Sequence, residues 1–484
     1  MPKITRRQVV GGAGSAILIG GAGIDPVRAV PNTTSRLTAD VCIVGAGFAG
    51  LAAAWRLKQA GASVVVLEAT PRVGGRSYTV TLPDKTFVDW GGQWVGPTQD
   101  RFYALIKEMG AETYPSPNIG RALQRSIVDA ARYDRLDESK DENYPGAGEI
   151  KAVYDKLDAL AESLDVNAPW THKEAARFDS LTYAEWLRQN VENEAARHFC
   201  GVEVGSVPCA SPEEISILHL AWMLKACRGI GKLFVDAQQD RIVGGTQPVA
   251  RRLAQRLGGD VVKTREPVRR IEWNDKGALV QSDNVAVQAR HVIIAIPPNL
   301  ANGIEFEPSL PTNRVQVTQR WPQGLVIKVA MVYPTPFWRD DGLSGTSFDP
   351  LAVMSETADS SNPENVSKAG ILTGFVYSDQ ARKVSPLAED DRKKLLLGEM
   401  VQRFGPRAAA PVNYHESNWT MAPWTRGCFT GFLTPGATAL LGPAMREPVG
   451  PIRWAGTETA THWPSFIDGA IRSGEREAAA VRAA

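Results

Sequence analysis

The chain has 484 residues, of which 43% are hydrophobic and 22% charged, and these ordinary values exclude disordered, collagen-like and coiled-coil proteins. Its 54 Lys and Arg against 53 Asp and Glu leave a net charge of +1, so no strong field attracts nucleic acid or an anionic membrane. The 5 cysteines and 6 histidines are scattered without the spacing of a disulfide framework or a metal site, so we expect no bound metal.

Residues 1–36 have the character of a targeting segment. Arg6 and Arg7 precede an uncharged, Gly-rich and Ala-rich stretch, and small residues follow near Ala29. This order describes a secretory signal, and the paired arginines resemble the twin-arginine type. The stretch is shorter than the roughly 20 residues that span a bilayer, so we expect no integral membrane span. We expect export to the periplasm, and the alternative is a basic tail on a cytoplasmic protein.

A strand, a glycine-rich turn and a helix are predicted directly after this segment. Residues 40–44 read Asp-Val-Cys-Ile-Val and predict a short buried strand, residues 45–50 read Gly-Ala-Gly-Phe-Ala-Gly, and residues 51–57 have helical character. A second apolar strand, 63–67, ends at Glu68. This is the pattern of a Rossmann-like dinucleotide-binding unit.

Each residue of that unit has a physical task. Gly45 permits the tight turn, Gly47 lets a pyrophosphate approach the backbone, and Gly50 lets helix and strand pack closely. The helix N-terminus offers free N–H groups to phosphate, and Glu68 is placed to accept the hydroxyls of the adenine ribose.

The next segment distinguishes FAD from a nicotinamide cofactor. Residues 72–76 read Arg-Val-Gly-Gly-Arg, which resembles the extended fingerprint of the glutathione-reductase-like FAD proteins. Gly75 again allows close backbone approach, and Arg76 supplies a fixed cation for the pyrophosphate. We therefore expect FAD as the cofactor.

Further segments resemble those of the bacterial, monoamine oxidase-like branch of the flavin-containing amine oxidases, in the family's order. They are 91–99 (GGQWVGPTQ), 295–298 (AIPP), 325–329 (LVIKV), 426–429 (RGCF) and 455–463 (AGTETATHW). The resemblance runs from about residue 39 to the C-terminus. Phytoene desaturases and protoporphyrinogen oxidases share only the glycine-rich dinucleotide-binding motif, and they would lack the Cys-aromatic and Thr-His-Trp segments.

The resemblance implies an α/β fold with two interleaved domains. The Rossmann-like, glutathione-reductase-like FAD domain would comprise 38–113, 244–317 and 422–484. An α+β substrate domain would comprise 114–243 and 318–421. In the latter, residues 183–197 predict a helix.

The family activity implied is oxidation of an amine to an imine, which water hydrolyses, with O2 reduced to hydrogen peroxide. Lys328 matches the lysine that holds a water against the flavin, while Phe429 and Phe466 match the aromatic pair around the amine. Cys428 matches the cysteine that carries a covalent flavin. The implied FAD-binding residues are Gly45, Gly47, Gly50, Glu68, Gly75, Arg76, Gly92, Gln93, Val268, Cys428, Gly456, Thr457, Glu458 and Ile467.

The chain departs from the family at several positions near the flavin. Phenylalanine replaces the usual tyrosine at both Phe429 and Phe466, which makes the cage more apolar. Gln93 and Trp94 replace the usual Ser and Tyr, and Thr70 replaces an arginine. Further substrate-cavity residues implied by the match are Trp94, Gln239 and Trp419.

These features favour an apolar, aromatic or cyclic amine as the substrate. A polyamine oxidase is an alternative, because carboxylates such as Glu203, Glu213 or Glu214 could hold a distal ammonium group. The sequence is also compatible with an amine dehydrogenase that passes electrons to a cytochrome, or with a flavin-bearing binding protein without turnover. The sequence does not indicate the oligomeric state, for which a homodimer is one option.

Overall fold

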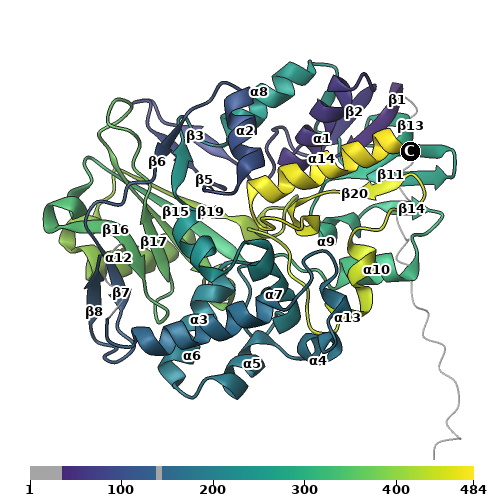
Figure 1. The fold of residues 1–484 in the computed structure, drawn as a ribbon. Coiled ribbons are helices and arrows are strands. Elements are labelled where there is room, and N and C mark those ends of the chain that lie inside the picture. Colours follow the sequence, from purple (N-terminus) through teal and green to yellow (C-terminus); the bar gives the residue numbers. More distant parts are fainter. Residues whose placement is uncertain (1–34, 138–143) are drawn as a thin grey trace, which may run out of the picture.

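The computed structural model describes residues 35–137 and 144–484, so residues 1–34 of the expected signal (1–36) lie outside them, whereas its last two residues belong to the first strand. Two large sheets form the centre of the molecule, and helices pack around them (Figure 1). Within these two described ranges, no helix is both long enough and apolar enough to cross a membrane.

The first large sheet has eight strands: β1 (Ser35–Val44), β2 (Val64–Glu68), β10 (Val262–Thr264), β11 (Val268–Asn274), β12 (Gly277–Ser282), β13 (Val285–Ile294), β14 (Glu305–Glu307) and β20 (Ile452–Trp454). Their order is β10-β2-β1-β13-β12-β11-β14, and β20 pairs with β13. β10, β2, β1 and β13 are mutually parallel, whereas β12 is antiparallel to both of its neighbours. β2 is buried throughout and reads Val-Val-Val-Leu-Glu, as expected for a parallel strand covered on both faces.

Four helices pack together beside the parallel strands: α1 (Phe48–Gln59), α2 (Asp100–Glu108), α8 (Gln247–Leu257) and α14 (Ile467–Ala483). α1 connects β1 to β2, and both strands run parallel, so the predicted βαβ unit is confirmed. The buried side chains of these helices share one hydrophobic cluster with Val41 and Ile43 of β1.

The second large sheet has seven strands: β7 (Arg121–Arg125), β8 (Tyr133–Leu136), β15 (Val326–Tyr333), β16 (Leu343–Phe348), β17 (Glu356–Asp359), β18 (Gly370–Tyr377) and β19 (Asn413–Asn418). Their order is β19-β15-β18-β17-β16-β7-β8. β15 lies between β18 and β19, antiparallel to both, and all eight of its residues are buried. Lys328 is the charged residue of this buried strand.

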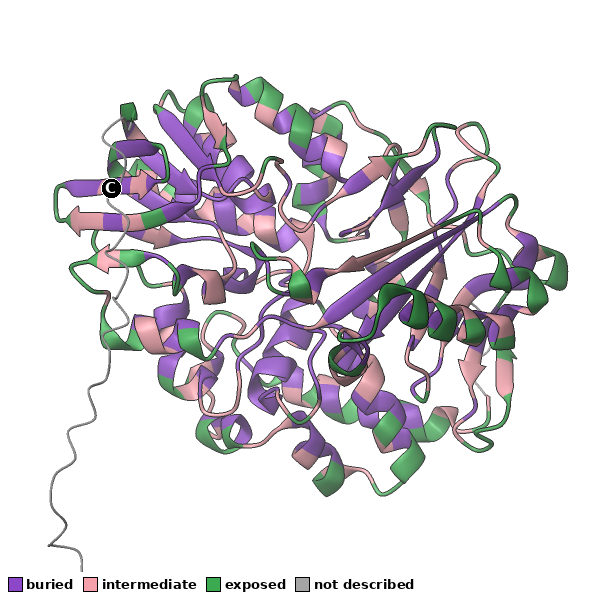
Figure 2. Cartoon of the chain, turned by 180° about the vertical axis from the view of Figure 1, so that it is seen from behind, coloured by how far each residue is buried: buried purple, intermediate pink, exposed green. Residues whose placement is uncertain are grey.

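Helices outside the first group are α3 (Ala147–Glu162), α4 (Ala175–Ser180), α5 (Tyr183–Asn190), α6 (Glu194–Ser206), α7 (Ile217–Ala226), α9 (Pro298–Ala301), α10 (Thr312–Gln319), α11 (Ser378–Val384), α12 (Glu389–Phe404) and α13 (Thr438–Leu441). The helix expected over 183–197 is two helices, because Val191 is extended and the Asn193 side chain caps α6 by accepting from Ala196 N. Figure 2 shows the large-sheet strands mostly buried and the outer sides of the helices exposed.

Two small sheets complete the strands of the described residues. β3 (Thr79–Thr81) pairs with β4 (Phe87–Asp89), and β9 (Asp240–Ile242) lies between β5 (Trp94–Val95) and β6 (Thr113–Pro115).

The two large sheets draw on alternating parts of the chain. Strands of the first come from 35–68, 262–307 and 452–454, and strands of the second come from 121–136 and 326–418. The predicted α/β class is therefore confirmed, whereas the domain boundaries stay predictions.

Candidate active site

A cavity of about 1070 Å³ extends from the β1–α1 turn to strands β7, β16, β17 and β18 of the second sheet. Its two ends differ in chemistry. The first end is lined by glycine turns and by Glu68, and the second by aromatic rings and carboxylates. We call these the nucleotide end and the distal end.

Most of the predicted site residues line this cavity. They are Gly45, Gly47, Glu68, Gly75, Arg76, Gly92, Gln93, Trp94, Val268, Lys328, Cys428, Phe429, Gly456, Thr457, Phe466 and Ile467. Four predicted residues are not among its lining: Gly50, Gln239, Trp419 and Glu458. Gly50 lies in α1 directly behind Gly45, where it lets the helix and the turn pack.

The nucleotide end is shaped by the turn after β1. Gly45 has φ +100°, and a Cβ there would lie 2.8 Å from the carbonyl oxygen of Ala295, so only glycine suits this position. Gly47 then caps α1 and leaves the helix N-terminus open to the cavity. These features fit the phosphates of a dinucleotide.

Glu68 closes the nucleotide end. Its carboxylate accepts from the backbone N–H of Ala46 at 2.7 Å and from the hydroxyl of Thr70 at 2.8 Å. Thr70 therefore fixes the carboxylate in a chain that lacks the family's usual arginine. The remaining acceptor capacity of Glu68 faces the cavity, where it fits ribose hydroxyls.

Arg76 and Glu458 form an ion pair across the molecule. Arg76 Nη1 donates to Glu458 Oε1 at 2.6 Å and to the carbonyl of Phe429 at 2.7 Å. Burial alone would raise the pKa of Glu458, but the charge and hydrogen bonds of Arg76 hold this pKa below its usual value. Glu458 does not line the cavity, but it holds the guanidinium of Arg76, which does.

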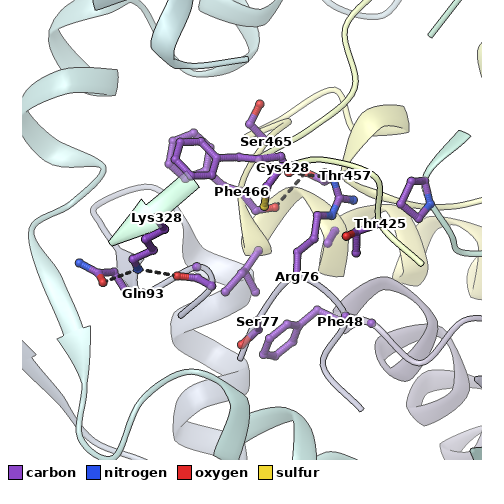
Figure 3. Close-up of a pocket in the computed structure, with 18 of the residues that line it drawn as sticks. Phe48, Arg76, Ser77, Gln93, Lys328, Thr425, Cys428, Thr457, Ser465 and Phe466 are labelled. Carbon is purple, nitrogen blue, oxygen red and sulfur yellow. Dashed lines mark hydrogen bonds between the residues drawn. The ribbon is translucent and has the colours of Figure 1, made fainter. Parts of the chain in front are cut away.

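Cys428 lines the cavity between this ion pair and Lys328 (Figure 3). Burial raises the pKa of its thiol to about 12, although the charges of Arg76 and Lys328 oppose the shift. The thiol is therefore neutral at physiological pH until something else draws off its proton.

Lys328 reaches the cavity from the middle of β15. Its Nζ donates to the Gly91 carbonyl at 2.7 Å and to Gln93 Oε1 at 2.6 Å (Figure 3). Burial lowers the pKa of Lys328 to about 7, against a favourable interaction with the Asp89 carboxylate. Both protonation states are therefore accessible near neutral pH.

Aromatic rings surround the space in front of Lys328. Phe429 meets Phe375 edge-on at 5.9 Å between centroids and Tyr377 at 6.1 Å. Phe466 lines the same cavity and meets Trp463 edge-on at 5.0 Å. The Phe375 ring centroid also lies 5.6 Å from Lys328 Nζ, so the rings give this part of the cavity an apolar wall.

Two of the predicted substrate residues, Gln239 and Trp419, do not line the cavity, and their roles stay predictions. Gln239 is exposed, and its neighbour Gln238 lines the cavity instead. Trp419 is buried behind the cavity, where its indole Nε1 donates to the carbonyl of Trp90 at 2.9 Å. It packs with the aromatic residues that line the site but does not line it.

The distal end holds two carboxylates, and only Glu203 was a sequence candidate. Glu203 lies on α6 and Glu356 on β17, and both line the cavity. The phenol of Tyr154 donates to Glu203, and the phenol of Tyr377 donates to Glu356 at 2.7 Å. Burial raises the pKa of Glu203 to about 8, and the charge of Glu356 adds to the shift.

Sequence reasoning did not find Glu356, Phe375, Tyr377 or Gln238. The available signal for Glu356 was a charged residue at the start of a short strand. That signal could not say which face of the sheet the side chain lies on.

Comparison with known proteins identifies the family. A model of flavin-containing amine oxidoreductases matches residues 48–482. The chain belongs to this family. Putrescine oxidase from Kocuria rosea is 37% identical over 91% of the chain and 95% of that protein, and L-amino acid dehydrogenase from a Synechocystis strain is 35% identical over 91% and 94%.

Solved structures agree with this assignment. Cyclohexylamine oxidase from Brevibacterium oxydans has a TM-score of 0.88 at 35% identity, covering 92% of this chain and 98% of that one. Putrescine oxidase bound to putrescine has a TM-score of 0.87 at 35% identity, covering 93% and 100%. The chain is thus an oxidoreductase that acts on amines, and the family implies FAD, which the glycine turns, Glu68 and Arg76 fit.

Proposed function

We propose that this protein oxidises an amine to an imine with FAD, that water hydrolyses the imine, and that O2 is the electron acceptor and yields hydrogen peroxide. FAD, when bound, supplies the two-electron acceptor. The reacting nitrogen would lie between Phe429 and Phe466, next to Lys328. The single observation that carries this placement is that Lys328 and both rings line one cavity with the nucleotide-binding turns.

The distal end supports a substrate with a second cationic group. Two partly buried carboxylates, Glu203 and Glu356, repel each other when both are charged, and an ammonium group between them would relieve that repulsion. We therefore favour a diamine, or an amine that carries a second basic nitrogen, over the apolar monoamine that the Phe429–Phe466 pair alone favours. The similarity to putrescine oxidase is consistent with this choice.

An amino acid is the less favoured substrate, although one relative is an L-amino acid dehydrogenase. Its carboxylate would need a cation at the distal end. Of the residues that line the cavity, the cations Arg72, Arg76, Arg269 and Arg426 belong to the nucleotide end or its rim, and Lys328 is held by two carbonyl groups.

Cys428 is proposed to hold the FAD through a thioether. The position of the thiol supports this tether, because it lines the cavity beside Arg76 and Lys328 and directly precedes Phe429. A covalent flavin would not be lost after export, and export by a twin-arginine-like signal is part of the same proposal.

Anaerobic bleaching of the flavin by a panel of amines tests the function. We expect diamines to bleach the flavin absorbance under argon, and air to restore it with peroxide formed in proportion to the amine oxidised. Bleaching without stoichiometric peroxide would instead favour a dehydrogenase that uses a cytochrome. If no amine bleaches the flavin, the proposal is wrong.

A further inference from the structure

The side chain of Gln93 connects Lys328 to a buried polar network. Gln93 is 1% exposed, its Oε1 accepts from Lys328 Nζ at 2.6 Å, and its Nε2 donates to Ser360 Oγ at 2.9 Å. A lysine ammonium can only donate, so the amide oxygen must face Nζ and the amide NH2 must face Ser360. The orientation of this amide is therefore determined by its two partners.

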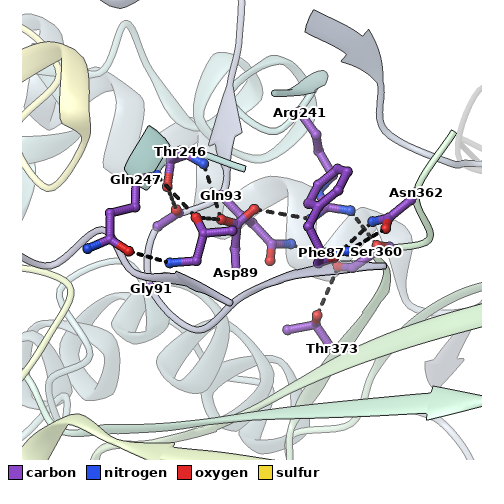
Figure 4. A network of polar contacts seen from close by, with 12 residues as sticks. Phe87, Asp89, Gly91, Gln93, Arg241, Thr246, Gln247, Ser360, Asn362 and Thr373 are labelled. Carbon is purple, nitrogen blue, oxygen red and sulfur yellow. Dashed lines mark hydrogen bonds and ion pairs between the residues drawn. The ribbon is translucent and has the colours of Figure 1, made fainter. Parts of the chain in front are cut away.

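Ser360 is itself held on two sides (Figure 4). Its hydroxyl accepts from Thr373 Oγ1 of β18 at 2.9 Å, and its carbonyl accepts from Arg241 Nη1. Arg241 pairs with Asp89 at 3.3 Å, and both side chains are almost fully buried. Asp89 in turn accepts from Thr79 Oγ1 at 2.6 Å, so Gln93 is anchored to a network that spans several strands.

This anchoring restricts the geometry of Lys328 Nζ. A tetrahedral nitrogen bonded to Cε has three other directions, and the Gly91 and Gln93 oxygens occupy two of them. One direction is left by these two oxygens, and Lys328 is among the residues that line the cavity. That direction carries an N–H when the lysine is charged and a lone pair when it is neutral.

We propose that Gln93 is a positioning residue for Lys328: it aims the third direction of Nζ into the cavity and stabilises the charged form of the lysine. Family resemblance assigned Gln93 only to the flavin contact, where the usual residue is a serine. A serine side chain is shorter and has no amide, so the contact between the amide oxygen and Nζ depends on the glutamine.

Other charged and titratable groups also face Lys328, and they stay in place in the test. Asp89 favours the ammonium form, Arg241 opposes it, and Cys428 would favour it as a thiolate. On the neighbouring β19, His415 stacks on Trp90 and Glu416 is paired with Arg392. A change at Gln93 alone therefore isolates its own effect.

The experiment measures the titration of Lys328 directly in the FAD-loaded enzyme. Lysine labelled with 13C at Cε is incorporated, and the Lys328 signal is assigned as the one missing from Lys328→Met. The signal is then followed against pH in wild type, Gln93→Leu, Gln93→Glu and Ser360→Ala. Gln124→Leu is the matched control, because Gln124 lines the same cavity at its distal end.

Removing the acceptor disfavours the ammonium, so Gln93→Leu should lower the titration midpoint by about one pH unit. Gln93→Glu places a carboxylate at the amine and should raise the midpoint by about one unit or more. Ser360→Ala should lower it by a smaller amount, because the amide is then free to turn. The pH profile of anaerobic flavin reduction should shift in the same direction.

Unchanged midpoints in Gln93→Glu and Ser360→Ala would overturn the proposal, even if Gln93→Leu fails to fold. An equal shift in Gln124→Leu would also overturn it, because the effect would then not depend on contact with Nζ. The titration does not depend on which amine is oxidised, so it can fail while the proposed function stands.

Discussion

Burial sets the charge state of the side chains on which the site depends. Lys328, Cys428 and Glu203 are each surrounded by protein, and each pKa moves in the direction that favours the neutral form. For Lys328 this shift has a cost in folding stability, since an unfolded lysine keeps its proton far above neutral pH.

The cost should be measurable with Lys328→Met. The unfolded lysine releases its proton near pH 10.5 and the folded one near 7, so between these values the unfolded state binds one more proton. Stability that depends on Lys328 therefore rises with pH in that window. From urea unfolding, the free energy of wild type relative to Lys328→Met should rise by about 1.4 kcal/mol per pH unit.

Lys383→Met is the control for this measurement, because Lys383 is an exposed residue of α11. It should show no pH-dependent difference from wild type. A flat difference for Lys328→Met as well would mean that the folded lysine keeps an ordinary pKa.

Cys428 gives a second residue-level prediction. If Cys428 carries the flavin, acid-precipitated wild type stays yellow and its mass exceeds that of the chain by one FAD. Cys428→Ser should release the yellow colour into the supernatant. Cys227→Ser is the matched control, since Cys227 is equally buried but does not line the cavity. Free flavin from wild type would contradict the tether.

At the scale of elements, the packing of α14 on α1 supports the nucleotide end. α14 begins right after Phe466, and α1 begins right after the glycine turn. A Cβ at Gly474 of α14 would lie 2.1 Å from the carbonyl oxygen of Ala49. The two helices therefore approach too closely for any larger residue at this point.

Gly474→Ala should consequently lower stability by about 2 kcal/mol or more, because backbone must move to relieve the clash. Gly398→Ala on α12 is the matched control, since a Cβ at this exposed helical glycine meets no atom within 4 Å. It should stabilise the protein by about 0.5–1 kcal/mol. Thermal or urea unfolding of both variants checks the pair, and equal effects would contradict the close packing.

The arrangement of the elements also explains which site residues could be predicted from the sequence and which could not. The turn from Gly45 to Gly50 and the acid Glu68 could be predicted because strand, turn and helix are adjacent in the chain. Gln239 could not be distinguished from its neighbour, since the sequence does not show which of the two faces the cavity, and in the structure Gln238 lines it. Glu356 was missed because its orientation depends on the position of β17 within a seven-stranded sheet.

On the scale of the whole molecule, the site joins parts of the chain that are far apart. Arg76 and Glu458 are separated by 382 residues, and their ion pair connects the first and last stretches around the cavity. Spacing along the chain gives no information about such a contact. Family resemblance marked both residues for FAD, whereas their pairing came from the structure.

Glu458→Gln tests this connection. Removing one partner leaves Arg76 largely buried without its counter-charge, which should lower stability by about 3 kcal/mol and weaken FAD retention. Glu185→Gln is the matched control, because its ion pair with Arg188 is exposed and screened by solvent, so its loss should leave stability nearly unchanged. Similar losses in the two variants, measured by urea unfolding, would show that the buried pair has no special role.

In the proposed function, one cavity holds a reacting amine at Lys328 and a second cation at Glu203 and Glu356. The most direct test compares a diamine with the monoamine of equal length. For each amine, the rate constant of anaerobic flavin reduction is divided by the dissociation constant of that amine. Wild type should favour the diamine by about tenfold or more, and this preference should increase as pH rises through about 8, where Glu203 ionises.

Glu356→Gln and Glu203→Gln should both reduce that preference while the monoamine still reduces the flavin. A diamine preference that both variants leave unchanged, or wild type that reduces its flavin equally well with either amine, would contradict the account.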